Sequence, residues 1–588
     1  MHRPRHEQNF YKNCENLRYA VGRLCGIRWI EKSRGYCPGG NVMKDKIMKI
    51  MTELVAFDSI SDSKKEVPCA EYIYNFLSAI PYFKEHPEDV GLLEITGDAH
   101  GRKVPYAFLK GNNKNTVVMM GHFDVVNAEV YGEAEELAFT IGEELEAALA
   151  KKALNPVQRA DMESGEWIWG RGAADMKGGL AIHMALFEQY AEKAQKGELP
   201  GCLMFMAVPD EESYSAGMRA GAEVLREFKR KYELDYKLLV DPEPTQISDG
   251  KQIMSIGSVG KTMPVVMVQG VTAHVGMCFN GISPLGILSE IYLHTNGSLE
   301  FTDVYEGEAT MPPTWTNMRD MKEIYDVSIP YRASGYFTVL SFSTTPDQIL
   351  AKLRKISEDA FEKMVTQLND TYQEYKKLNK FETREKLHYD TLVLSFAELV
   401  ERLKKEDEVA FNAQYDKIYK EVEEKVQNGE LNYPAATIAL MNKVLDYADI
   451  KQPLVLLGFA PPYYPAVHSD LIAGKEGAGT DAYNFVKEAA AAFGQDMNYE
   501  NYFMGISDAS YSCMDHPFDY NAFSANTPMW GELYSLDFEA IEEIGIPAVI
   551  YGPIGKEYHQ WTERVNKKSL LEVVPAVTQQ LFEHLWAK

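Results

Sequence analysis

The strongest constraint on the fold is a series of short apolar strands that alternate with helices and end in polar residues. The segments 116–120, 202–208 and 237–240 are expected to be buried strands. A fourth unit, at 167–190, is expected to be a strand, a glycine-rich loop and a helix. This alternation predicts an α/β fold, in which chemistry collects beyond the carboxyl ends of the strands.

A chain of 588 residues is too long for one ordinary hydrophobic core, so several domains are expected. The pattern changes near residue 257, where a second set of strands and helices begins, and the first pattern resumes near 453. We therefore expect a catalytic domain in two parts, 43–257 and 453–588, with an acidic surface insertion at 127–166. Between the two parts we expect a satellite domain at 258–400 and a helical connection at 401–452.

The first 42 residues differ from the rest, because they hold eight basic residues and three acidic ones. We interpret residues 1–42 as a poorly structured extension, with a targeting arm as the competing interpretation. The whole chain carries a net charge of −26, which argues against nucleic acid or an anionic membrane surface as a partner. Seven cysteines without a CxxC pair indicate neither a disulfide framework nor a thiolate zinc site, and they favour the cytoplasm.

Five acidic or histidine residues stand at strand ends or in loops: His122, Asp175, Glu212, Asp241 and His559. Two histidines and three carboxylates suit zinc or a similar divalent metal. Five ligands exceed one tetrahedral ion, but with one shared carboxylate they suit two ions about 3.5–4 Å apart. Taken alone, Asp175 would more often be a helix cap, so the prediction depends on the whole set.

Three further residues accompany this set. Asp124 lies two residues after His122, on the same side of an extended segment, where it can fix the tautomer of the histidine. Glu211 and Glu212 point in different directions, so one can bind metal while Glu211 serves as the general base. Asp241 ends a strand directly and is the preferred ligand there, and Glu243 remains an alternative.

The motifs that carry these residues resemble one family of co-catalytic zinc hydrolases, which includes acetylornithine deacetylase, succinyl-diaminopimelate desuccinylase, aminoacylase and glutamate carboxypeptidase. Six segments match in the correct order: 121–126, 170–179, 210–212, 241–242, 270–274 and 545–563. The resemblance implies a mixed-sheet zinc-hydrolase catalytic domain and an inserted α+β satellite domain of the lid or dimerisation type. It covers the chain from about Met43 to the end.

The resemblance also implies a role for each ligand of two divalent metal ions, with zinc preferred and cobalt or manganese as alternatives. Asp175 bridges the two ions. His122 and Asp241 complete one site, and Glu212 and His559 complete the other.

Outside the ligand set, the resemblance implies that Asp124 orients His122 and that Glu211 is the general base. His274 on the satellite domain helps to hold the oxyanion, from its own subunit or from the partner in a homodimer. The peptide bond between Asp175 and Met176 is expected to be cis.

A segment at 312–327, with 336–340, resembles the arginine-utilisation (RocB-type) branch of the family. This implies a metal-dependent hydrolase that cleaves an amide bond of a dipeptide, an N-acyl amino acid or a related derivative, in arginine or amino-acid catabolism. The alternatives are a catalytically retired binding or regulatory relative and an aminopeptidase of a related clan without a satellite domain. The family's G-G-T-D-A loop has two candidates, 505–509 and 478–482.

Overall fold

The computed structural model describes residues 40–379 and 381–588, so the predicted extension at 1–42 lies outside the described residues except for its last three. The chain divides into two units after Asp45, and the second unit, 46–588, contains both sheets. Its larger sheet has the strand order β1-β2-β5-β3-β6-β19-β8-β18, with β7 paired to β8. The strands are β1 Val90–Glu94, β2 Lys103–Leu109, β3 Asn115–His122, β5 Cys202–Val208, β6 Asp235–Asp241, β7 Ile247–Ser248, β8 Lys251–Ser255, β18 Met497–Glu500 and β19 Ala548–Ile550.

The centre of this sheet is parallel, antiparallel pairs flank it, and the edge strand β18 runs parallel to β8. Strand β3 runs parallel to both β5 and β6, and β6 runs parallel to β19. The pairs β1–β2, β2–β5 and β19–β8 are antiparallel. The carboxyl ends of β5, β3 and β6 therefore meet at one edge of the sheet, as the sequence pattern predicts.

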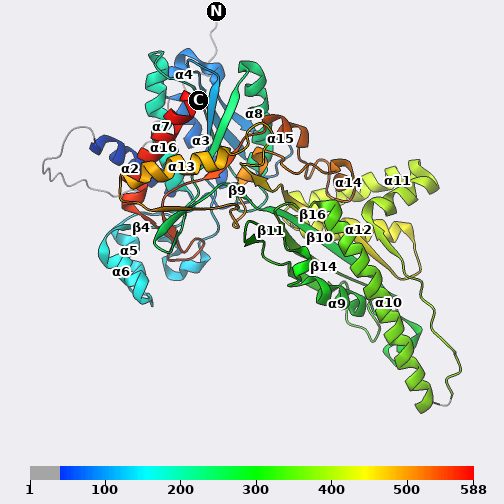
Figure 1. The fold of residues 1–588 in the computed structure, drawn as a ribbon. Coiled ribbons are helices and arrows are strands. Elements are labelled where there is room, and N and C mark those ends of the chain that lie inside the picture. Colours follow the sequence, from blue (N-terminus) through cyan, green and yellow to red (C-terminus); the bar gives the residue numbers. More distant parts are fainter. Residues whose placement is uncertain (1–39, 380) are drawn as a thin grey trace, which may run out of the picture. The chain divides into compact units, whose positions relative to one another are not determined.

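Helices cover both faces of this sheet (Figure 1). Neighbouring residues of β5 point to opposite faces. Phe205 packs against Phe187 of helix α7 (Lys177–Gln195), with ring centroids 5.4 Å apart. Met206 points to the other face, where it lies in one apolar cluster with Met218 of helix α8 (Ala216–Tyr232). The other helices of this domain include α3 Glu66–Ser78, α13 Ala478–Ala491, α15 Phe538–Ile544 and α16 Val574–Ala587.

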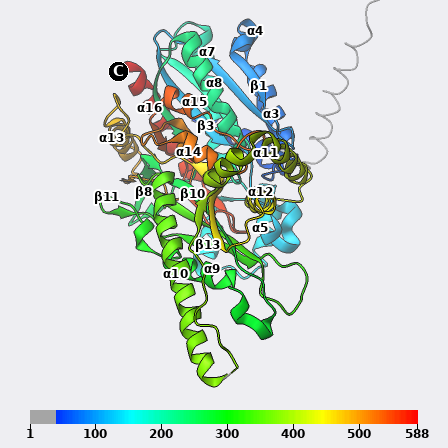
Figure 2. The ribbon, with the colours of Figure 1, turned by 90° about the vertical axis from the view of Figure 1, so that its right-hand side faces the viewer.

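A second, five-stranded sheet has the order β13-β14-β10-β16-β15. Its strands are β10 Gly260–Gln269, β13 Thr314–Asp320, β14 Arg332–Ser341, β15 Val393–Ser395 and β16 Leu454–Tyr464. Helices α9 Pro284–Thr295, α10 Pro346–Leu378, α11 Phe396–Gln427 and α12 Tyr433–Ala448 accompany it (Figure 2). Helix α10 has 33 residues, yet none of the described helices is both long and apolar enough to cross a bilayer. This sheet with its helices forms the α+β satellite.

Strand β16 belongs to the second sheet, where it pairs with β10 from Lys261–Tyr464 to Gln269–Leu454. Helix α12, within the expected connection at 401–452, packs against the same two strands. A buried apolar strand looks the same in sequence whichever sheet it joins. We therefore propose that the satellite continues to Tyr464 and that the second catalytic part begins after it, rather than at 453.

The acidic insertion at 127–166 has a small core of its own. It contains a 3-10 helix (Glu129–Leu137) and two short helices, α5 (Glu143–Leu149) and α6 (Pro156–Ser164). Its apolar residues are scattered among acids, which hides them in the sequence. They pack together against strand β4 (Trp167–Trp169), which pairs with β21 (Arg564–Asn566). The insertion thus supports the strand that leads into the loop of Asp175.

Candidate metal centre

The predicted site residues gather at the carboxyl edge of the larger sheet. His122 is the last residue of β3, and Asp241 is the last residue of β6. Glu211 and Glu212 follow β5 within a few residues. Because these three strands are parallel neighbours, their ends bring the side chains together.

Asp175 lies between the two predicted metal-binding histidines. Its Oδ1 is 3.2 Å from Nε2 of His122, and its Oδ2 is 3.3 Å from Nε2 of His559. Burial acts to raise the pKa of Asp175, but the hydrogen bonds from both histidines outweigh burial and lower it below its usual range. The peptide bond from Asp175 to Met176 is cis, as predicted. Each carboxylate oxygen therefore faces one histidine, which is the arrangement expected of a bridging ligand.

His559 and Glu212 form one side of the site. The Nε2 atom of His559 is 3.0 Å from the Glu212 carboxylate. Hydrogen bonds to Asp175 and Glu212 raise the pKa of His559 to about 10. The His559 side chain is 52% exposed, whereas that of His122 is 1% exposed. This side of the site is therefore the one open to solvent.

On the buried side, His122 lies closest to Asp175 and Glu243. The distance from His122 Nε2 to Glu243 Oε1 is 3.3 Å. Asp241 makes a different contact, since its Oδ2 accepts a hydrogen bond from Ser507 Oγ at 2.5 Å. We therefore propose Glu243 as the ligand on this side, in place of the preferred Asp241. The extended chain after β6 points both carboxylates the same way, and the longer one, two residues farther on, reaches the histidine.

The donor set fits divalent metal ions. At this edge of the sheet, two sets of three residues each place their ligand atoms within 4.8 Å of one another. One set is His122, Asp175 and Glu212, and the other is His122, Glu211 and Glu243. Burial raises the pKa of Glu211 and Glu243 well above the usual value, since buried carboxylates without a cation are costly as anions. Imidazole and carboxylate ligands that need positive charge are those that zinc and similar ions use.

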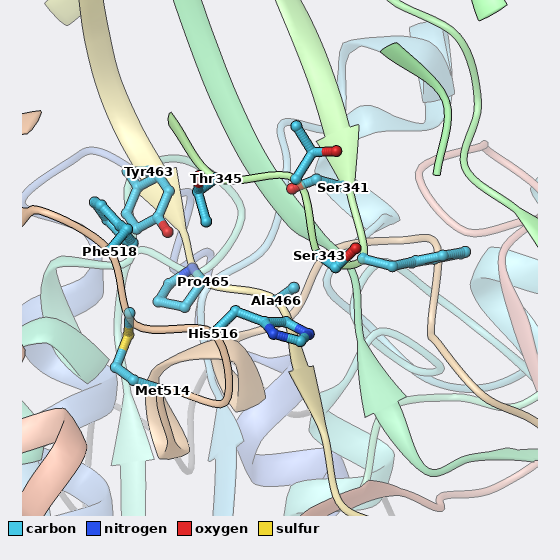
Figure 3. A pocket seen from close by; sticks show the side chains of 11 residues that line it. Ser341, Ser343, Thr345, Tyr463, Pro465, Ala466, Met514, His516 and Phe518 are labelled. Atoms are coloured by element: carbon cyan, nitrogen blue, oxygen red, sulfur yellow. The ribbon is translucent and has the colours of Figure 1, made fainter. Parts of the chain in front are cut away.

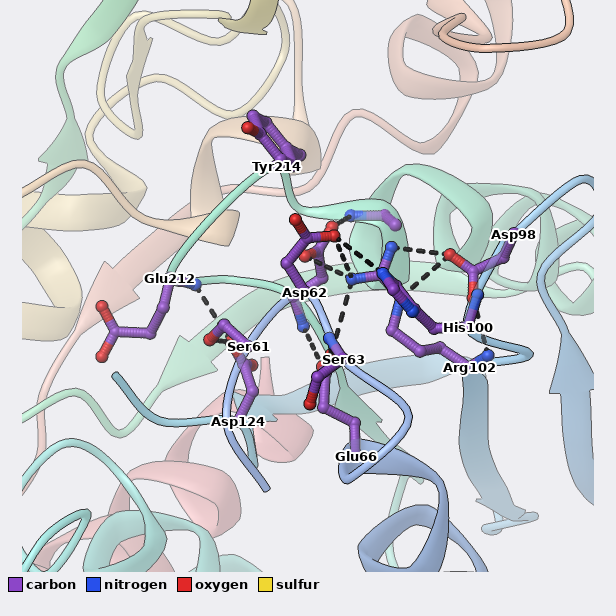
Figure 4. Close-up of polar contacts among 12 residues, drawn as sticks. Ser61, Asp62, Ser63, Glu66, Asp98, His100, Arg102, Asp124, Glu212 and Tyr214 are labelled. Carbon is purple, nitrogen blue, oxygen red and sulfur yellow. Dashed lines mark hydrogen bonds and ion pairs between the residues drawn. The ribbon is translucent and has the colours of Figure 1, made fainter. Parts of the chain in front are cut away.

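Asp124 lies beside Glu212 of the loop that carries the expected base (Figure 4), and Asp124 also contacts His122. The Nδ1 atom of His122 lies 3.0 Å from the backbone oxygen of Asp124 and 3.5 Å from its carboxylate. The same carboxylate accepts hydrogen bonds from the backbone N–H groups of Glu211 and Glu212, at 3.1 and 3.2 Å. Asp124 therefore contacts the histidine ring and also fixes the loop beside it.

A buried charge cluster behind this loop was not evident from the sequence (Figure 4). Arg102 binds Asp98 through two nitrogens, at 2.9 and 2.6 Å, and also contacts the carboxylates of Asp210 and Glu66. Glu66 in turn accepts the backbone N–H of Asp210 at 2.8 Å. Asp210 has a left-handed backbone, with φ of 71°. These contacts hold the first residue of the Asp210–Glu212 loop in an unusual conformation.

Replacing Arg102 with methionine should lower the unfolding free energy by about 3–5 kcal/mol, because three buried carboxylates lose their cation. Urea unfolding followed by circular dichroism measures the change. Arg230→Met is the matched control, since Arg230 pairs with Glu543 at the surface and its loss should change little. Equal shifts in the two variants would contradict a supporting role for the Arg102 cluster.

Glu563 supports the Asp175 loop, a role that its four-residue spacing from His559 did not reveal. One of its oxygens accepts the backbone N–H groups of Ala174 and Asp175, at 3.2 and 3.3 Å. The other accepts from Arg171 Nη1 at 2.6 Å, and Arg171 also binds the backbone oxygen of His559. Glu563 and Arg171 thus connect the loops of the bridging aspartate and of His559.

Of the two candidate G-T-D-A-type loops, 505–509 lies at the site. Ser507 donates to Asp241, as described above, and the neighbouring Asp508 is buried with both carboxylate oxygens unpaired. Burial raises the pKa of Asp508 to about 8. In the other candidate, Asp481 lies on helix α13 and contacts Lys588 and His584 near the chain end. The loop at 478–482, with the sequence A-G-T-D-A, matches the G-G-T-D-A pattern more closely but lies away from the site.

His274 lies apart from the other predicted site residues. It stands in an exposed loop of the satellite, where its Nδ1 accepts the backbone N–H of Gly276 at 3.1 Å. Within the described residues it forms no hydrogen bond or ion pair with the cluster around Asp175. Its oxyanion role remains a prediction.

A small cavity of about 20 Å³ lies between Tyr463, Thr345 and His516 (Figure 3). Its volume holds about one water molecule. None of the predicted site residues lines it, so it is separate from the cluster around Asp175.

An α/β sheet with histidines and carboxylates at its carboxyl edge, and with an inserted α+β domain, defines a hydrolase of the metallopeptidase type. The chain belongs to peptidase family M20/M25/M40, whose family model matches residues 118–583. The predicted family is thereby confirmed.

Two relatives match almost the whole chain. The "Uncharacterized protein YqjN" of Bacillus subtilis is 33% identical over 542 residues, which cover 90% of this chain and 95% of YqjN. The "Protein RocB" of the same organism is 29% identical over 560 residues, covering 92% of this chain and 95% of RocB. A succinyl-diaminopimelate desuccinylase of Helicobacter hepaticus is 26% identical over 217 residues, or 32% of this chain and 55% of that enzyme.

Solved structures share the fold. The aminopeptidase PepT from Bacillus cereus has a TM-score of 0.50 at 14% identity, covering 93% of this chain and 99% of that one. The M20 family metallo-carboxypeptidase Sso-CP2 from Sulfolobus solfataricus also has a TM-score of 0.50, at 12% identity, covering 92% and 99%. At such low identity these similarities bear on the fold alone, and they confirm the α/β catalytic domain with an inserted α+β domain.

Proposed function

We propose that this chain is a two-metal hydrolase that cleaves an amide bond of a dipeptide, an N-acyl amino acid or a related amino-acid derivative. The observation that carries the proposal is the position of Asp175, whose two oxygens face His122 and His559 separately. A structural aspartate needs no such pair of histidines, whereas a ligand shared by two ions does. Zinc is the proposed metal, because imidazole and carboxylate ligands suit it.

The proposed ligands are His122 and Glu243 on the buried side, Glu212 and His559 on the open side, and Asp175 between them. When bound, the ions would lower the pKa of water to about 7 and polarise the scissile carbonyl.

Glu211 is the proposed general base. Its carboxylate lies 3.9 Å from His122 Nε2, beside the ligands, and burial raises its pKa well above the usual value. It would take a proton from the attacking water and give it to the leaving amine. Asp124 holds the backbone of Glu211 and Glu212 during both transfers.

The substrate class rests on the relatives. RocB and the desuccinylase match this chain, the former along nearly its full length. The desuccinylase's name describes removal of an acyl group from an amino-acid derivative, which fits an N-acyl amino acid as substrate here. The similarity to RocB supports arginine or another nitrogen-rich amino acid, in arginine catabolism.

We also propose a cytoplasmic homodimer formed through the satellite domain. Strand β13 is the edge of the five-stranded sheet, and an edge strand can pair with a second copy. In such a dimer, His274 of one subunit would lie near the metal site of the other subunit. The four cysteines of the described residues are free thiols, which fits a reducing compartment.

The proposed function is tested by amine release from a panel of dipeptides and N-acyl amino acids, arginine derivatives included. Zinc-loaded wild-type protein should hydrolyse at least one of them, and chelation should abolish the activity. A metal-loaded protein that releases no amine from any member of the panel would contradict the proposal.

A further inference from the structure

Lys261 lies at the start of the first satellite strand, close to the expected base. It is the second residue of β10 and pairs with Tyr464 at the end of β16. Its Nζ lies 5.6 Å from the centre of the Tyr464 ring. The position is fixed by the backbone pairing of two strands rather than by a loop.

Tyr464 connects this lysine to the catalytic edge of the larger sheet. Its hydroxyl is 2.8 Å from Oγ of Ser215, which follows the loop of Glu211 and Glu212. Burial raises the pKa of Tyr464 and lowers the pKa of Lys261, and the charge of Glu211 acts to raise both. Lys261 and Tyr464 therefore both lie within electrostatic range of Glu211.

Among the described residues the ammonium of Lys261 forms no salt bridge, and its contacts are the Tyr464 ring and the more distant charge of Glu211. The two buried arginines near the site are paired, since Arg171 binds Glu563 and Arg102 binds Asp98. The buried Lys177 instead donates a hydrogen bond to the backbone oxygen of Phe57. Lys261 is half-buried, so part of its hydration is lost, and the Tyr464 ring and the charge of Glu211 offset only part of this loss. Such a cation, beside a reaction centre, is suited to bind an anionic group of a ligand.

We propose that Lys261 binds a carboxylate of the substrate next to the scissile amide, and so selects acylated amino acids and peptides with a free carboxylate over their neutral amides. The inference deepens the proposed function and rests on it. Lys261 would act as a specificity-determining residue, while the proton transfers remain with Glu211.

The test compares an N-acetyl amino acid with its primary carboxamide, using the panel member that the wild type hydrolyses best. In Lys261→Met, kcat/KM for the N-acetyl amino acid divided by kcat/KM for its carboxamide should fall about 10- to 100-fold. This is the usual effect of losing one charged hydrogen bond. Lys261→Arg keeps the charge and should retain most of this selectivity. Lys355→Met is the matched control, because Lys355 is 70% exposed on helix α10 and should leave the ratio unchanged.

A wild-type ratio that persists in Lys261→Met would overturn the inference while leaving the proposed function intact. If no hydrolysis occurs, calorimetry can measure binding of the same two compounds to the zinc-loaded protein. This measurement tests carboxylate binding by Lys261 separately from the proposed hydrolase activity. Preference for the carboxylate that depends on Lys261 would then support this inference and contradict the proposed function. Equal binding to wild type and Lys261→Met, or no binding at all, would contradict the inference.

Discussion

Glu211→Gln should reduce kcat by roughly 10²- to 10⁴-fold, because glutamine cannot accept the proton of the attacking water. KM should change much less, since the carboxamide has nearly the same shape and the ligands around it are untouched. Steady-state kinetics on the best substrate of the panel measures both values. Glu94→Gln, at an 82% exposed position of β1, is the matched control and should keep full activity.

The metal content of Glu211→Gln decides whether Glu211 is a base or a ligand. Its carboxylate belongs to one of the two groups of possible ligand atoms, with His122 and Glu243. As a base, it can be replaced without loss of metal. Full activity of a metal-loaded Glu211→Gln protein would exclude Glu211 as the base, and loss of one ion would make it a ligand instead.

The fold followed from the sequence because buried strands and helices carry strong local patterns. The three parallel strands that end at His122, the Glu211 loop and Asp241 each contain a short run of consecutive apolar residues. The local sequence of a strand does not show which other strand it pairs with. From its sequence, strand β16 is therefore predicted to begin the second catalytic part, although its backbone hydrogen bonds join β10 of the satellite sheet.

Most residues of the proposed metal cluster could be named from the sequence, and the choice among neighbouring carboxylates depends on how far each side chain reaches. Asp241 and Glu243 lie two residues apart on the same side of an extended segment. Only the structure shows that the shorter one, Asp241, accepts a hydrogen bond from Ser507. The supporting roles of Arg102 and Glu563 come from contacts between distant parts of the chain. A single arginine or glutamate in the sequence does not indicate which distant residue it will contact.

Asp175→Ala should abolish binding of both metal ions, because one carboxylate lies between the two histidines. Glu243→Ala should lose the ion on the buried side and keep the other. Asp241→Ala should keep both ions, since its carboxylate hydrogen bonds to Ser507 rather than to the histidine. The matched control is Asp359→Ala, at a 59% exposed position on α10, which should also keep both.

The measurement that tests the bridging role of Asp175 most directly is native mass spectrometry of zinc-reconstituted wild type and Asp175→Ala. We expect two zinc ions per chain in the wild type and none in the variant. A wild type without zinc, or an Asp175→Ala protein that still carries two ions, would contradict the metal centre proposed for this chain.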